Sequence, residues 1–146
     1  MAHARPVDGY RRERPRYADM LLATLTPFPV VCFTLALLTD LAYWRTSYLM
    51  WQHFSAWLLL VGIVVGGCAL LVSIIATLTH RPGHRWSHIG LGVLVLALAF
   101  LNNLVHARDG WTAVVPSGLV LSALTVAALI ASGLMRRASA SSRWSS

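Results

Sequence analysis

The chain has 146 residues, of which 57% are hydrophobic and 12% are charged, and its formal net charge is +7. The charged share is about half that of an average soluble domain, which argues against a soluble globular fold. All twelve basic residues are arginines in tails and turns between apolar runs, where they set membrane orientation. We therefore expect a lipid bilayer around this protein and no nucleic-acid partner.

A basic tail, residues 1–19, precedes the first apolar run. We place the first membrane span at about residues 20–43. Pro27 and Pro29 lie in its first half and lack backbone N–H donors, so we expect a kink there.

A short loop, residues 46–53, leads into the second span, which we place at about residues 54–79. This span holds the longest uncharged run, the 22 residues from Leu58 to Thr79. As a helix the run is roughly 33 Å long, against a hydrocarbon core of about 30 Å. The loop and its flanks are aromatic, as in a belt at headgroup depth: Tyr43, Trp44, Tyr48, Trp51, Phe54 and Trp57.

Three glycines in the second span indicate close helix packing. Gly62 and Gly66 have the small-xxx-small spacing, and Gly67 follows directly. Glycines at this spacing let another helix approach closely, so that van der Waals contacts hold the pair together. We predict packing inside the bundle, with homodimerisation as the alternative.

The third span is placed at about residues 89–106 and the fourth at 113–135, followed by a basic, serine-rich tail, residues 136–146. Ten arginines lie in the two tails and in the turn 80–88, whereas only Arg45 and Arg108 lie in the other two turns. This asymmetry places both termini in the cytoplasm. The predicted fold is an all-α, antiparallel four-transmembrane-helix bundle.

Histidines near the span ends could bind a b-type haem, which needs two axial ligands on facing helices. His53 opens the second span and His106 closes the third, so their depths match, and Asn102 or Asp40 could orient an imidazole. On the other side of the membrane, His80 and His88 form a less favoured pair. Histidines at helix ends are also common interfacial residues without a ligand, so the expectation is that no cofactor binds, with haem b as the alternative.

The sequence predicts no metal site. His80, His84 and His88 have helical spacing, but Pro82 and Gly83 interrupt the helix that zinc binding would need. The two cysteines, Cys32 and Cys68, both lie in apolar runs and are interpreted as packing residues.

Asp40 is the acidic residue closest to a span interior. It could belong to a proton or ion path, but a lone acid near Arg45 at a helix end is more often solvated or salt-bridged. Asn102 and Asn103 are expected to hydrogen-bond across helices. Together with Asp40 they are predicted to form a structural polar cluster.

The element Pro27-Phe28-Pro29, the run from Leu37 to Tyr43, and the later Trp57-Leu58 and Gly62 resemble the bacterial membrane proteins of domain of unknown function 2231. His88 and Asn102 add to the resemblance, which covers about residues 20–135. It implies a four-span inner-membrane protein without an established activity. Some relatives accompany periplasmic oxidoreductases, which implies a role in electron transfer or anchoring.

The sequence departs from this family pattern at places where histidines or asparagines are expected. Leu22 stands where a histidine commonly precedes the proline pair, and Gly90 and Gly92 stand where an asparagine follows His88. Arg136-Arg137 begins the tail in place of a glycine-rich, histidine-bearing ending. If the family histidines bind a cofactor, this member lacks some of the ligands, which favours an accessory role.

No nucleophile elbow, phosphate loop, dinucleotide fingerprint or HExxH motif is present in the sequence. We therefore expect a protein that is not an enzyme: an accessory or anchoring subunit that docks with other subunits of a larger respiratory or redox complex. The alternative is a small membrane electron-transfer protein that uses haem b or a quinone. Small-solute transport through Asp40 is the third hypothesis.

Overall fold

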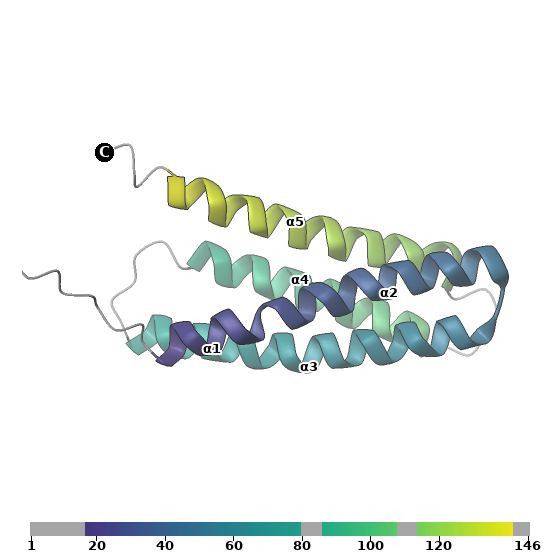
Figure 1. The fold of residues 1–146 in the computed structure, drawn as a ribbon, viewed down its shortest axis with the longest axis horizontal. Coiled ribbons are helices and arrows are strands. Elements are labelled where there is room, and N and C mark those ends of the chain that lie inside the picture. The colour runs from purple at the N-terminus through teal and green to yellow at the C-terminus, as the bar shows by residue number, and fades with distance from the viewer. Residues whose placement is uncertain (1–16, 80–85, 108–113, 142–146) are drawn as a thin grey trace, which may run out of the picture.

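A computed structural model describes residues 17–79, 86–107 and 114–141 (Figure 1). The helices are α1 (Tyr17–Leu25), α2 (Pro27–Thr46), α3 (Leu49–Thr79), α4 (Trp86–His106) and α5 (Leu119–Ser141), with one π-helical turn, η1 (Val114–Gly118), before α5. Four stretches are long and apolar enough to cross a membrane: Tyr17–Thr46, Leu49–Thr79, Trp86–His106 and Pro116–Met135. The predicted fold class, an all-α bundle of four spanning helices, is confirmed.

The first span is interrupted between α1 and α2. Pro27 and Pro29 lack the N–H groups that would continue the helical hydrogen bonds, and Pro27 is the first residue of α2. Thr26 lies between the two helices with helical dihedrals (φ −62°, ψ −36°), and its backbone N–H and its hydroxyl both donate to the Leu22 carbonyl, at 3.0 and 2.6 Å. This break lies where the proline pair predicted a kink.

The connection between α2 and α3 is shorter than the loop predicted over residues 46–53. Ser47 adopts a left-handed conformation (φ 57°), and its N–H donates to the Tyr43 carbonyl at 2.7 Å, which ends α2. Helix α3 begins two residues later, at Leu49. Trp51 and Phe54 of the aromatic belt therefore lie on α3, with ring centroids 6.4 Å apart.

The bundle core is built from apolar side chains, two of them alanines and one a phenylalanine. Its buried members are Phe33, Ala36, Leu59, Val95 and Ala99, from α2, α3 and α4, and α5 adds partly buried apolar side chains. Lipid tails are as apolar as these residues, so close packing rather than water exclusion holds the helices together.

Two of the three predicted packing glycines occupy such crossings. A Cβ at Gly62 would overlap the Phe33 ring, and one at Gly66 would lie 2.9 Å from Leu96 Cδ2 and 3.3 Å from Pro29 Cγ. Gly62 therefore allows α2 to approach closely, and Gly66 allows both α2 and α4 of the same chain to do so. The prediction is wrong for Gly67, where a Cβ meets no atom within 4 Å.

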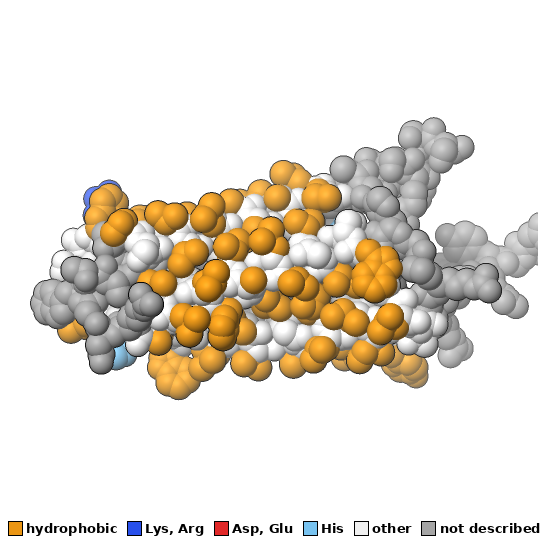
Figure 2. Space-filling view, turned by 180° about the vertical axis from the view of Figure 1, so that it is seen from behind, with side chains coloured by type: hydrophobic (Ala, Val, Ile, Leu, Met, Phe, Trp, Pro, Cys, Tyr) orange, Lys and Arg blue, Asp and Glu red, His pale blue; other side chains and the backbone are white. Residues whose placement is uncertain are grey.

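The outer surface of the bundle is apolar along its length, as Figure 2 shows for one face. Cys32 is buried in agreement with a packing role, whereas Cys68 is exposed on this outer surface and does not fill the core; both are free thiols. The start of α1 and the end of α5 lie at one end of the bundle, here called the terminal end, and the α2–α3 connection lies at the other, here called the hairpin end (Figure 1).

Candidate functional site

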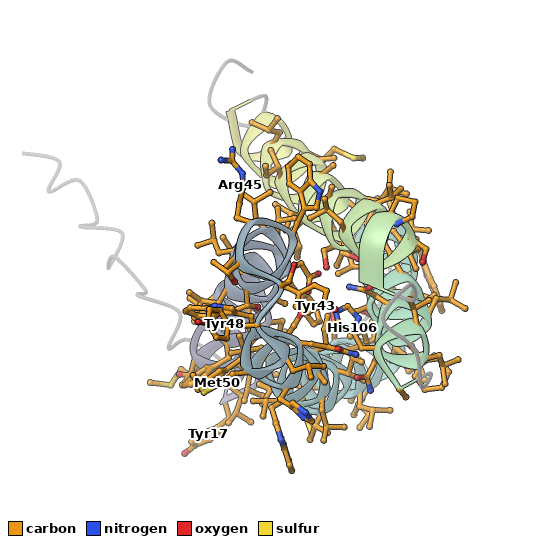
Figure 3. The ribbon with its side chains drawn as sticks, turned by 90° about the vertical axis from the view of Figure 1, so that its right-hand side faces the viewer. Tyr17, Tyr43, Arg45, Tyr48, Met50 and His106 are labelled. Atoms are coloured by element: carbon orange, nitrogen blue, oxygen red, sulfur yellow. The ribbon has the colours of Figure 1, made fainter. Side chains whose placement is uncertain are left out.

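The hairpin end encloses five polar side chains from four helices. They are Asp40 of α2, Ser55 of α3, Asn102 and His106 of α4, and Ser122 of α5, and all are buried. We call them the Asp40 network. Figure 3 looks into the bundle from this end, with His106 pointing to its centre beside Tyr43.

The Asp40 carboxylate is the centre of the network. Its Oδ1 accepts a hydrogen bond from the Ser55 hydroxyl at 2.5 Å and lies 2.8 Å from His106 Nε2. Its Oδ2 accepts a hydrogen bond from the Ser122 hydroxyl. Both carboxylate oxygens are therefore bonded to side chains of the three other spanning helices.

The hydrogen bonds of His106 determine how many protons it shares with Asp40. Its Nδ1 lies 2.9 Å from the Asn102 carbonyl oxygen, which can only accept, so Nδ1 carries a hydrogen. The 2.8 Å contact from Nε2 to Asp40 Oδ1 needs one further hydrogen between the two atoms. The pair is either carboxylic acid with neutral imidazole or carboxylate with imidazolium. In both forms its net charge is zero, which suits two side chains that are 0% exposed inside a membrane span.

Asn102 extends the network from α4 to α5. Its Nδ2 donates to the Ser122 oxygen at 2.6 Å, while the Ser122 hydroxyl donates onward to Asp40. Asn102 and His106 are four residues apart, so they share one face of α4. The Asn102 Oδ1 is buried and accepts no hydrogen bond from the residues that the structure describes.

The antiparallel helix register brings the network together. Asp40 lies six residues before the end of α2 and Ser55 six residues after the start of α3, so both lie roughly 9 Å below the hairpin connection. On the other pair of helices, Asn102 and His106 occupy the last turns of α4 and Ser122 the first turn of α5. All four helices therefore deliver a polar group to the same depth.

The two histidines of the haem alternative lie in different surroundings. His106 is buried with both ring nitrogens hydrogen-bonded, so it could bind iron only by giving up one of those bonds. His53 is exposed on α3 and does not belong to the Asp40 network. His88 is half-buried near the terminal end, and His80, its partner in the less favoured haem pair, lies outside the described residues.

The expected surroundings of Asp40 are wrong. We expected a solvated acid or a salt bridge to Arg45, but Asp40 is 0% exposed and its ionisable partner is His106. The Arg45 guanidinium instead lies over the Trp44 ring, 5.7 Å from its centroid. The structure does bring Asp40 and Asn102 into one cluster, bridged by Ser122, and Asp40 does orient the His106 imidazole.

Asn103, the third member of the predicted polar cluster, is half-buried and outside the Asp40 network. Its backbone carbonyl accepts the Ala107 N–H at 3.0 Å at the end of α4. It follows Asn102 directly and so points about 100° away around the helix.

Sequence reasoning did not assign Ser55 and Ser122 to the site. Serine and threonine in membrane helices commonly bond to a carbonyl of their own helix, as Thr34, Thr77 and Thr125 do here. The signal that distinguishes Ser55 is its distance from the α2–α3 connection, which matches that of Asp40. That match becomes visible only when the helix ends are known.

The network can hold a proton and join four helices through hydrogen bonds. Within the described ranges, no three histidine, cysteine, aspartate or glutamate side chains are placed to share a metal ion. Its acid and base are both enclosed and bonded to each other.

Comparison with protein families agrees with a membrane protein. The family model described as predicted membrane protein (DUF2231) matches residues 21–135, which is most of the chain and includes all five residues of the Asp40 network. No curated protein and no solved structure matches the chain. The match over all four spans confirms the resemblance seen in the sequence, and the chain belongs to the DUF2231 family of predicted membrane proteins.

Proposed function

We propose that this protein is a non-enzymatic accessory or anchoring subunit of a larger assembly in the bacterial inner membrane, with both termini in the cytoplasm. The observation that carries the proposal is the enclosure of the Asp40 network. A catalytic or transport site must admit a substrate, whereas Asp40, Ser55 and Asn102 are 0% exposed and bonded within the bundle.

A structural role accounts for the polar residues. Hydrogen bonds between membrane helices are worth about 1 kcal/mol each, and a mismatched register leaves polar groups unpaired in hydrocarbon. Since Asp40 bonds to Ser55, His106 and Ser122, sliding or rotating any one helix breaks a bond at the centre of the bundle. The network therefore favours one arrangement of the helices, as a rigid anchoring module requires.

The outward faces supply surfaces for docking. Each spanning helix exposes large apolar side chains, among them Leu38 of α2, Val64 of α3, Leu104 of α4 and Leu124 of α5. These faces can pack against lipid or against helices of another subunit. An accessory subunit uses at least one of them for protein contact.

The test places a photo-crosslinking amino acid at Leu38, Val64, Leu104 or Leu124, one position per helix, in cells that express the protein from its own locus. We expect a protein adduct of discrete mass at one or two helices and lipid adducts at the others. The same four variants, purified as detergent-solubilised monomers before illumination, serve as the control. Lipid adducts alone at all four positions in native membranes would overturn the accessory role.

Electron transfer is the second candidate, and one observation favours its quinone form over its haem form. A haem on His53 and His106 would require one exposed ligand to turn inward and the other to release a hydrogen bond. A quinone requires an apolar cavity with polar groups at one end, and the terminal half of the bundle contains such a cavity.

A further inference from the structure

The terminal half of the bundle contains a cavity of about 530 Å³ that opens to the outer surface, away from the Asp40 network. All of the helices contribute to its walls: Leu22 and Pro29 from α1 and α2, Gly66 from α3, Leu96 from α4 and Gly133 from α5. Its volume lies within the roughly 300–1,000 Å³ of small-molecule sites.

The cavity follows from the break in the first span and from the course of α5. Helix α1 packs mainly against α3, whereas α5 packs against α2 and α4. Figure 1 shows α5 diverging from α1 toward the terminal end. Val30, which is 41% exposed, lines the cavity and marks where it reaches the outer, lipid-facing surface.

The polarity of the walls changes with depth. Phe33, Val95 and Leu129 form an apolar inner part, nearest the bundle centre. His88, in the first turn of α4, places an imidazole near the terminal end, and Ser73 adds a hydroxyl about 9 Å from the end of α3. A ligand that fits therefore has an apolar tail and a compact polar head.

The head must also be uncharged. None of the described residues that line the cavity is an Asp, Glu, Arg or Lys, so a phosphate head would lack a cationic partner. Thr26 and Ser132 donate their hydroxyl hydrogens to the Leu22 and Leu129 carbonyls, which leaves their oxygens as acceptors toward the cavity. The ring hydroxyls of a quinol can donate to these oxygens, and the ring carbonyls of a quinone can accept from the Ser73 hydroxyl or from an imidazole N–H.

We propose that this cavity binds one isoprenoid quinone or its quinol, with the ring near His88 and the tail passing between α1 and α5 into the lipid. The site lies at the opposite end of the bundle from the Asp40 network. It is also independent of docking to a partner, so either proposal can fail without the other.

The test uses variants that fill the cavity from two different walls. Gly133→Leu acts from α5, where a Cβ meets no atom within 4 Å, and Ala69→Leu acts from α3. Gly90→Leu is the matched control, because Gly90 also has no atom within 4 Å of its Cβ position and does not line the cavity. Two independent variants keep the test valid if one of them fails to fold.

Each protein is purified in mild detergent, incubated with decylubiquinone and, separately, with phosphatidylglycerol, and analysed by native mass spectrometry. We expect one decylubiquinone per chain on the wild type and on Gly90→Leu, and about tenfold weaker binding to the filled variants, because the added side chain displaces apolar contacts. The absence of a decylubiquinone adduct on the wild type, equal adducts on wild-type and filled proteins, or a cavity that retains only phosphatidylglycerol would each overturn the proposal.

Discussion

At the scale of single residues, the proton shared by Asp40 and His106 makes Asp40→Asn and Asp40→Leu very different substitutions. An asparagine amide can donate to His106 Nε2 and accept from Ser122, so the network stays bonded. A leucine removes the Asp40 oxygens to which Ser55, Ser122 and His106 are bonded, and each buried polar atom left without its partner costs about 1–3 kcal/mol. We expect the free energy of unfolding of Asp40→Asn to lie within about 1 kcal/mol of the wild-type value. Asp40→Leu should be clearly less stable, and thermal unfolding in detergent measures both.

Thr39→Leu is the control for these Asp40 variants. It also removes a polar side chain from α2, but Thr39 donates only to carbonyls of its own helix, at 3.1 and 2.9 Å. Its stability should stay close to that of the wild type. An Asp40→Asn protein as unstable as Asp40→Leu would show that the network needs the ionic form of the pair rather than hydrogen bonding alone.

At the scale of helices, Gly62 and Gly67 offer a matched pair of substitutions on α3. An alanine at Gly62 must displace the Phe33 ring, which is 1% exposed, so we expect Gly62→Ala to lose about 1–3 kcal/mol. An alanine at Gly67 meets no neighbour and should gain about 0.5–1 kcal/mol from helix propensity. Unfolding of both variants in sodium dodecyl sulfate gives the two free energies. If Gly62 instead packed against a second copy of the chain, Gly62→Ala would change the oligomeric state more than the free energy of unfolding.

Helix positions could be read from the sequence, whereas helix rotation and register could not. Apolar length predicted that there are four spans, and the proline pair predicted where α1 gives way to α2. Asp40, Asn102 and His106 were recognised as polar residues near one end, but the solvated environment expected for Asp40 was wrong. A lone acid near a helix end is consistent with either water or a buried partner. Only the fixed register of α2 against α4 and α5 decides between them.

The cavity was not predictable for a related reason. Its walls are ordinary membrane residues, such as Leu22, Leu96 and Leu129, and their sequence carries no sign of an empty volume. The volume arises because α5 diverges from α1 after the break at Thr26, a property of helix geometry and not of any one residue. The proline pair predicted a change in the first span, but it did not predict that α5 would diverge from α1.

At the scale of the whole molecule, the arginine distribution and the fold together make one prediction about orientation. The bundle places the ends of α1 and α5 at the terminal end, the side of the three segments that hold ten of the twelve arginines. The positive-inside tendency therefore puts the terminal end in the cytoplasm and the hairpin end outside.

In a protein whose Cys32 and Cys68 are replaced by alanine, Ser47→Cys should react with a membrane-impermeant maleimide in spheroplasts. Thr79→Cys, the last residue of α3, should react only after permeabilisation. The opposite labelling would place the Asp40 network in the cytoplasmic leaflet and the quinone-sized cavity in the outer leaflet.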